Sequence, residues 1–249
     1  MISELSLPAL DALWEDLRLG AIPFPLEVRS HGETVEERSR IKAAVYADLE
    51  SRGLARRQRP EPQLEDVLQL VARPTISIDA VAMLDMAGQQ PVKAIVVATG
   101  RQAVLVVQRE LMVSLTPIRE TALAASIVGV LPQVKAGPGV PVSLPVDAVN
   151  RSGGRHSRPD PDNRMNLQRL EAVMKEPVVR AGQFGVTIRD PQGRPNRLPG
   201  IGWFDTAAGR YMNIVREAGD GEAWLTLTPA DGGRIAHRLS EELLKALQS

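Results

Sequence analysis

Two segments of this chain end in nearly the same five residues. They read VSLTP at Val113–Pro117 and LTLTP at Leu225–Pro229, and each precedes a helical pattern. Two earlier landmarks recur in the same order: Gly100-Arg101 corresponds to Gly209-Arg210, and Arg109-Glu110 corresponds to Arg216-Glu217. This order predicts an internal repeat in which a hairpin is followed by a helix.

The two matching strands also alternate in step. Their apolar and polar positions coincide: Val113 and Leu115 fall on Leu225 and Leu227, and Ser114 and Thr116 fall on Thr226 and Thr228. A shift of one residue would move every apolar side chain to the wrong face. Chance is the alternative, because LTP is a short tripeptide. We predict two related halves of mixed helix and strand, joined in one antiparallel sheet.

A period of two residues begins at Thr75 and predicts four strands: ISIDAVAML, VKAIVVAT, AVLVVQ and LMVSLT. Their short connections require antiparallel neighbours. Four more strand patterns follow later, GQFGVTIRD, GIGWFD, RYMNIVRE and AWLTLT, with a hairpin turn predicted at Asp220-Gly221. We predict an N-terminal half at 1–131, a flexible connection at 132–160 and a C-terminal half at 161–249, within one structural domain.

One helix has a complete set of boundary residues. Thr34 and Glu37 fit a capping box, and Gly53 fits a left-handed C-cap, so the helix is predicted at about 35–52. Its apolar stripe contains Ile41, Val45 and Leu49. Further helices are predicted at 7–20, closed by Gly20, and at 63–72, 119–131, 161–176 and 234–247, and a strand is predicted at 25–30.

The composition excludes several classes of protein. The chain has 30 Lys and Arg against 30 Asp and Glu, which argues against a nucleic-acid surface or a polybasic membrane patch. It contains no cysteine, which excludes disulfides, thiolate metal sites and cysteine nucleophiles. The amphipathic N-terminus lacks the pattern of a signal peptide. We therefore expect a soluble cytoplasmic protein.

No motif of catalysis or cofactor binding is present in the sequence. His31, His156 and His237 lack partners at ligand spacing, and there is no P-loop, dinucleotide fingerprint or nucleophile elbow. Asp160–Asn163 lacks the glycine and glutamate of a calcium loop, and the arginines of 151–164 are expected to be solvated. We therefore expect no metal, no cofactor and no catalytic residue.

Three alternatives concern the aromatic second half. Trp203 and Phe204 face opposite sides of a strand, so either both are core residues or one lies on an open face. An unrecognised enzyme could use Asp205, Arg210 and Tyr211, although a turn with an Asp–Arg ion pair is the simpler interpretation. A structural protein that self-associates through its sheet is the other functional alternative to be considered beside the enzyme.

The chain resembles the EspG family of type VII (ESX) secretion-associated proteins of actinobacteria. The resemblance covers nearly the whole chain. It is carried by LWEDLRLGAIPFPLEVRSHGETVEERSRIKAAVYADLESRGL, LEDVLQLVARP, GQFGVTIRDPQGR, WFDTAAGRYM and WLTLTPAD. It implies an α+β fold, with a central antiparallel sheet, flanking helical bundles and two halves related by a quasi-two-fold axis.

The resemblance also implies a function. EspG proteins are cytoplasmic, non-catalytic chaperones that bind the PPE subunit of PE–PPE heterodimers, keep it soluble and deliver it for export. It implies no nucleic-acid partner, no membrane insertion, and a monomer or weak dimer when free. The family's interface maps loosely onto residues 83–91, the strands around Phe184 and helix 161–176. The expected contact residues are Met83, Met86, Gln89, Gln90, Phe184, Trp203 and Tyr211.

Overall fold

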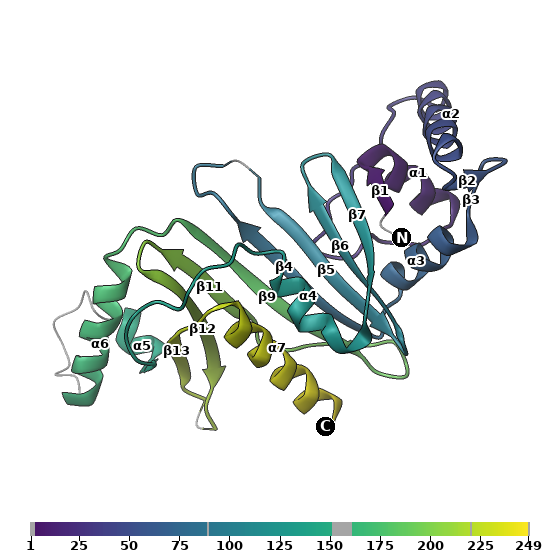
Figure 1. Cartoon of the computed structure of the whole chain (residues 1–249). Helices are drawn as coiled ribbons and strands as arrows, with labels where there is room; N and C mark the ends of the chain where they lie inside the picture. The colour runs from purple at the N-terminus through teal and green to yellow at the C-terminus, as the bar shows by residue number, and fades with distance from the viewer. Residues whose placement is uncertain (1–2, 89, 151–160, 220, 249) are drawn as a thin grey trace. The chain divides into compact units, whose positions relative to one another are not determined.

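The computed structural model describes residues 3–88, 90–150, 161–219 and 221–248 (Figure 1). The fold is α+β, a large antiparallel sheet with helices, as the sequence predicted. Contacts divide the chain into two compact units. Unit 1 holds Met1–Ala80, Val92–Val130 and Thr187–Asn196; unit 2 holds Val81–Pro91, Leu131–Val186 and Arg197–Ser249. Residues 81–91 and 187–196 thus belong to the opposite unit from their neighbours in the sequence.

Unit 1 contains most of the elements before residue 131. In chain order they are β1 (Ser3–Ser6), α1 (Leu7–Asp16), α2 (Val35–Ser51), β2 (Ala55–Arg56), β3 (Arg59–Pro60), α3 (Pro62–Ala72), β4 (Ile76–Met83), β5 (Val92–Thr99), β6 (Gln102–Arg109), β7 (Met112–Ile118), the 3-10 helix η1 (Glu120–Ala122) and α4 (Leu123–Val128). From later in the chain, unit 1 also contains β10 (Pro195–Arg197), except for the last residue of that strand. The sheet order is β1-β7-β6-β5-β4, and β4 ends in unit 2.

Unit 2 contains the later elements. They are β8 (Val142–Pro145), α5 (Val146–Asn150), α6 (Pro161–Met174), β9 (Arg180–Arg189), β11 (Ile201–Thr206), β12 (Gly209–Glu217), β13 (Ala223–Pro229) and α7 (Gly232–Leu247). The strand order is β9-β11-β12-β13-β8, and the last residues of β9 belong to unit 1.

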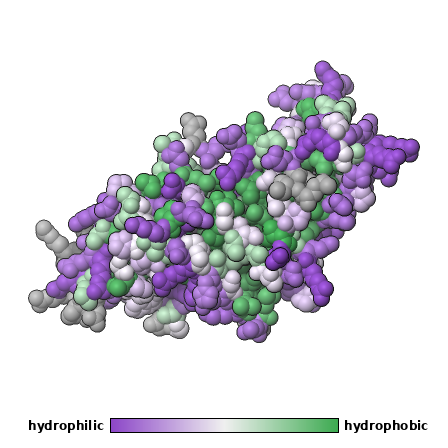
Figure 2. Space-filling view, in the orientation of Figure 1, coloured by the Kyte–Doolittle hydropathy of each residue, from purple (hydrophilic) through white to green (hydrophobic). Residues whose placement is uncertain are grey.

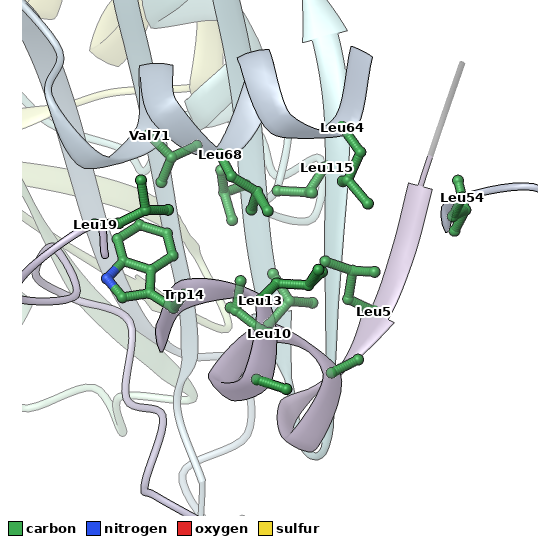
Figure 3. Close-up of a cluster of buried hydrophobic side chains, with 14 of the residues drawn as sticks. Leu5, Leu10, Leu13, Trp14, Leu19, Leu54, Leu64, Leu68, Val71 and Leu115 are labelled. Carbon is green, nitrogen blue, oxygen red and sulfur yellow. The ribbon is translucent and has the colours of Figure 1, made fainter. Parts of the chain in front are cut away.

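The core of unit 1 lies between helices α1 and α3 and one face of the sheet. Figure 3 shows its aliphatic side chains, with Leu64 and Leu68 of α3 directed toward Leu115 of β7. Ile95 of β5 belongs to this cluster, whereas its neighbour Val96 is buried outside it. Successive strand residues face opposite sides, so Val96 lies on the face against which α4 packs. The sheet of unit 1 is therefore covered on both faces.

The predicted hairpin-then-helix pattern is present in each unit. In unit 1, β6 pairs with β7 and α4 follows; in unit 2, β12 pairs with β13 and α7 follows. Val113 and Leu115 are buried on one face of β7, and Leu225 and Leu227 pack into one cluster in unit 2. The apolar positions that coincide in the two sequences therefore pack on one face of the corresponding strand in each hairpin. The quasi-two-fold axis stays a prediction.

The predicted helix at 35–52 is confirmed as α2. Thr34 Oγ1 accepts a hydrogen bond from the backbone N–H of Glu37 at 3.1 Å, and Glu37 Oε2 accepts one from Glu33 N at 2.9 Å. Gly53 has φ +68°, and Leu54 N donates to Leu49 O at 2.8 Å, which closes the last turn. The helix predicted at 7–20 is shorter than expected, because α1 ends at Asp16 and Arg18 has a φ of +53°.

The strand predicted at residues 25–30 was wrong. Glu27 is paired by a side chain instead, because Gln108 Oε1 accepts from Glu27 N at 2.8 Å and Gln108 Nε2 donates to Glu27 O at 2.8 Å. The amide of Gln108 thus makes the two bonds that a neighbouring strand would make. The backbone N–H and C=O of this segment need hydrogen-bond partners as they would in a strand, so its sequence pattern resembles that of a strand.

The predicted flexible connection at 132–160 needs correction in its first part. Residues 132–150 contain β8 and α5, and β8 pairs with β13 in the register Leu144↔Leu225. Lys135 O accepts from Arg210 N at 2.9 Å, and Gly137 N donates to Arg210 O at 2.9 Å. These contacts attach the segment to β12. Residues 151–160, and with them His156, lie outside the described residues.

Acidic side chains of α1 face basic side chains of α2. Arg38 forms ion pairs with both Asp11 and Glu15, and Lys42 Nζ lies 3.1 Å from Glu15 Oε1. Burial opposes ionisation of Asp11, but hydrogen bonds from Arg38 and His31 outweigh it, so the pKa of Asp11 lies below its ordinary 3.8. Hydrogen bonds from Arg38 and Lys42 hold the pKa of Glu15 below 4.5.

This ionic contact predicts a dependence of stability on pH. Both carboxyl pKa values are lower in the folded chain than in the unfolded chain, so their stabilisation is present above the unfolded values and is lost as pH falls through the folded values. We expect the free energy of unfolding to decrease between about pH 5 and about pH 3. Urea denaturation at a series of pH values measures it.

Arg38→Met removes the cation that lowers both pKa values and is expected to flatten this pH profile. Arg40→Met is the matched control, because the Arg40 side chain is exposed and its Nε donates to the backbone oxygen Glu36 O rather than to a carboxylate. A profile for Arg38→Met as steep as that of the unchanged protein would contradict the assignment.

Candidate functional site

A buried ion pair lies at the centre of unit 2. Asp205 of β11 and Arg210 of β12 are opposite each other across the strand pair, and both are almost fully buried. Arg210 Nε donates to Asp205 Oδ1 at 2.7 Å and Arg210 Nη2 donates to Asp205 Oδ2 at 3.0 Å. Arg210 Nη2 also donates to Pro132 O at 3.0 Å. The Asp–Arg ion pair that the sequence favoured over a catalytic site is thus present.

Two further contacts connect this pair to the surface. Arg180 Nη1 lies 3.6 Å from Asp205 Oδ2, and Arg180 Nε donates to Leu84 O at 3.1 Å. Val179 N donates to Asp205 O at 2.8 Å. Leu84 begins the loop between β4 and β5, and Val179 precedes β9. Asp205 therefore positions two surface segments of unit 2 through Arg180 and the backbone.

Both aromatic residues of β11 are core residues, which is one of the two alternatives that the sequence left open. Phe204 stacks on Tyr211 with ring centroids 5.4 Å apart, in the cluster that contains Leu170 of α6. Trp203 lies on the other face, where the Arg210 guanidinium carbon is 4.8 Å from its ring centroid. Asp205, Arg210 and Tyr211 are all buried, and burial raises the pKa of Tyr211.

Glycine is required beside Trp203. A Cβ on Gly182 would lie 2.5 Å from Val81 O and 2.9 Å from Trp203 Nε1. Trp203 Nε1 is buried, and among the described residues it has no hydrogen-bond partner. Gly182 therefore lets the large indole ring of Trp203 pack close to the backbone at the end of β4.

The structure separates the predicted contact residues into two groups. The first group contains Phe184, Trp203 and Tyr211, whose side chains are buried. They were expected on an exposed binding face, and the structure corrects this, because they pack inside unit 2 and support the sheet. The others belong to the β4–β5 loop region. Met83 is partly buried, Met86 and Gln90 are exposed, and Gln89 lies outside the described residues.

The first half of the β4–β5 loop has a defined turn. Asp85 Oδ1 accepts from Ala87 N at 2.9 Å, and Gly88 N donates to Asp85 O at 2.9 Å. A Cβ on Gly88 would lie 3.0 Å from Asp85 O, which favours glycine there. Met86 lies within this turn and is 50% exposed. The turn thus presents an apolar, flexible side chain to solvent on a fixed backbone.

Sequence reasoning missed three exposed apolar residues of the same unit. Met165 and Met174 lie on α6, and Val179 lies in the connection from α6 to β9. Helix α6 packs against unit 2 through Leu170, which is buried, and Asn166 Nδ2 donates to Ser143 O at 3.3 Å. Met165 and Met174 are nine residues apart, so they lie on opposite sides of α6, and their spacing in the sequence indicates no single apolar face.

In the described part of the chain, no group of three His, Asp or Glu side chains is placed to hold a metal ion. No helix within that part has the length and apolar character needed to cross a membrane.

Comparison with known proteins identifies a family and a similar solved structure. A model of the EspG family matches residues 6–241. Among solved structures, the chain is similar to the Mycobacterium tuberculosis type VII secretion system chaperone EspG5, whose structure is of its complex with the PE25-PPE41 dimer. The TM-score is 0.72 at 12% sequence identity, and the match covers 98% of this chain and 96% of that chain. No curated protein matches the sequence.

The buried pair yields a prediction for stability. Arg210→Met leaves the Asp205 carboxylate buried without its main partner. Asp205→Asn leaves the Arg210 guanidinium buried without its carboxylate. Each variant is therefore expected to lower the free energy of unfolding by about 3–5 kcal/mol. The double variant Asp205→Asn/Arg210→Met is expected to lose less than the sum of the two, because neither member of the pair then remains as a fully buried charge without its partner. Guanidinium denaturation measures all three. Single variants within about 1 kcal/mol of the unchanged protein would refute this role.

Proposed function

The chain belongs to the EspG family, and from this we propose that it is a non-enzymatic chaperone of type VII secretion. In this proposal it binds the PPE subunit of a PE–PPE heterodimer, keeps that subunit soluble and targets it for export. The observation that carries the proposal is the family match over residues 6–241, which spans both units of the fold. The structural match to EspG5 likewise covers both chains almost completely.

The proposed client surface lies in unit 2. It consists of the β4–β5 loop with Met83, Met86 and Gln90, together with the exposed apolar residues at the end of α6 and in its C-terminal connection, Met174 and Val179. Methionine side chains are flexible and polarisable, so they adapt to apolar partners of different shape. An exposed apolar tip of a helical client would aggregate in water, and this surface would cover it.

Arg180 has a positioning role in this proposal. It donates to Leu84 O at the start of the loop and lies near the buried Asp205 carboxylate. The loop backbone is thereby set before the client binds, which reduces the conformational entropy lost on binding. Phe184, Trp203 and Tyr211 act indirectly, by holding the strands that carry these segments.

Two alternatives are weaker. An enzyme built on Asp205, Arg210 and Tyr211 would need these side chains to reach a substrate, and each is buried with a partner: Tyr211 Oη donates to Pro138 O at 3.0 Å. Self-association would make the mass of the free protein depend on its concentration, which light scattering measures directly. The surface of exposed methionines fits a partner better than it fits a reaction.

Co-expression with each PE–PPE pair of the source genome tests the function. We expect one pair to co-purify with the chain and to elute as a complex with one copy of each of the three proteins, measured by size exclusion with light scattering. If the folded chain binds none of the pairs, the chaperone proposal fails, and the alternatives of enzyme and self-assembly are reopened.

Met86→Glu tests the surface. A charge at this exposed loop position would have to be desolvated against an apolar client, so we expect affinity to fall by at least ~10-fold while the free chain stays folded. Met112→Glu is the matched control, because Met112 is a similarly exposed methionine (42% against 50%) in unit 1. Titration calorimetry with the purified heterodimer measures both. Equal losses for the two variants would contradict the proposed surface.

A further inference from the structure

The β2–β3 hairpin of unit 1 carries three exposed arginines. Arg56 lies on β2, Arg57 in the turn and Arg59 on β3. Within the described part of the chain, none of the three guanidinium groups forms an ion pair or a hydrogen bond. Figure 2 shows the strongly hydrophilic surface at the place where this hairpin projects in Figure 1. The hairpin thus presents a compact group of unpaired positive charges.

This arrangement opposes folding of the hairpin in two ways. Arg56 and Arg59 are directly opposite each other in the strand register, and like charges in that position repel. The turn residues Arg57 and Gln58 have φ values of +51° and +59°, a left-handed conformation that Asn-Gly would adopt with less strain. Features that weaken local structure without a structural benefit are concentrated at functional sites.

A pocket with a largely apolar lining lies at the base of the same hairpin. Leu54, just before β2, lines it with Leu64, Val67, Leu115 and Pro117, and its volume is about 420 Å³. Glu61 and Gln63 also line it. Figure 3 shows Leu64 and Leu115 at this edge of the unit 1 core. The volume lies within the range of ligand pockets and is sufficient for a few aliphatic or aromatic side chains.

The pocket and the arginines are close enough for one ligand to contact both. Leu54 N donates to Leu49 O and Glu61 N donates to Leu54 O at 2.9 Å, so the root of the hairpin is fixed at the pocket. Arg56 is two residues from Leu54, which corresponds to about 7 Å along a strand. The first turn of α3 also lines the pocket, and its partial positive charge lies at the same end.

We propose that this pocket and the arginine hairpin together form a second docking site, for an acidic protein segment that carries an apolar anchor residue. The anchor side chain enters the pocket beside the one carboxylate of its lining, Glu61, while carboxylates of the ligand two to four residues away face the arginines and pair with the guanidinium groups. Arginine suits this role because its planar fork bonds both oxygens of a carboxylate.

Charge favours a protein segment over a membrane. Recognition of anionic lipid requires about four to eight clustered basic residues. Here there are three, and Glu50 and Glu61 lie in the same stretch of chain, where Glu50 Oε1 accepts from Gln58 N at 2.9 Å. The whole chain is also neutral by formal charge, so it has no long-range attraction to a polyanion. Short-range pairing between an arginine and an individual carboxylate does not depend on the net charge of the chain.

This inference does not rest on the proposed function. All of its residues belong to unit 1, whereas the proposed client surface belongs to unit 2. A chain that binds no PE–PPE pair could still bind an acidic segment at this site, and the reverse also holds.

Fluorescence anisotropy with the full chain tests the proposal. The probe is a fluorescein-labelled peptide Glu-Asp-Leu-Phe-Asp-Glu. Two control peptides have lysine at each acidic position, or alanine in place of Leu and Phe. We expect the probe to bind at least ~10-fold more tightly than either control, because each control lacks one of the two contacts.

Variants locate the binding. Arg56→Glu/Arg57→Glu/Arg59→Glu is expected to weaken probe binding by at least ~10-fold, and Gln63→Trp, which places a large ring at the pocket, is expected to do the same. The control Arg40→Glu/Arg101→Glu/Arg119→Glu has the same change of charge on other exposed arginines of unit 1 and is expected to retain binding. Circular dichroism establishes that each variant is folded.

Three outcomes overturn the proposal. The first is that the probe does not bind, or binds no better than its controls. The second is that both triple variants weaken binding equally, which would indicate only nonspecific charge. The third is that vesicles of phosphatidylglycerol bind through the three hairpin arginines while the peptide does not, which would assign the site to a membrane surface.

Discussion

The buried pair of Asp205 and Arg210 determines much of the geometry of unit 2. Two charges removed from water are stable only when their hydrogen-bonding groups find partners, and here the partners beyond the pair itself come from outside the two strands. Pro132 supplies a carbonyl and Arg180 a second cation. The requirement to satisfy one buried carboxylate and one buried guanidinium thus fixes the segment before β8 and the start of β9.

From this pair the order extends to the surface. Arg180 connects Asp205 with the carbonyl of Leu84, and the next residue, Asp85, forms its own turn around Met86. Asp205, which is almost fully buried, and Met86, which is half exposed, are therefore connected through the side chains of Arg180 and Asp85 and the backbone of Leu84. This is why a motif that could be read as catalytic, an Asp, an Arg and a Tyr close in the sequence, has a structural role here.

Local patterns were sufficient to predict most of the helices and strands. The capping box at Thr34 predicted the start of α2 because the two side chains satisfy backbone donors within one turn. The alternation of side chains along a strand predicted β5, β6 and β12, because this alternation too is a local property of the sequence. Two of the failures involve distant partners. The segment at 25–30 resembles a strand because Gln108, far away in the sequence, supplies the bonds of one, and β8 becomes a strand through β13.

The candidate site illustrates the same limit. Residue type identified Met86 correctly as an exposed apolar residue, but it also selected Trp203 and Tyr211, which are among the most buried. Large aromatic side chains are as useful in a core as at an interface, so their chemistry alone does not distinguish the two. The difference depends on the elements that cover each face: Leu170 of α6 joins the cluster around Tyr211, and the backbone of β4 closes over Trp203. Methionine on a tight turn has no such covering element, and it is the turn chemistry of Asp85 and Gly88, readable in the sequence, that keeps Met86 at the surface.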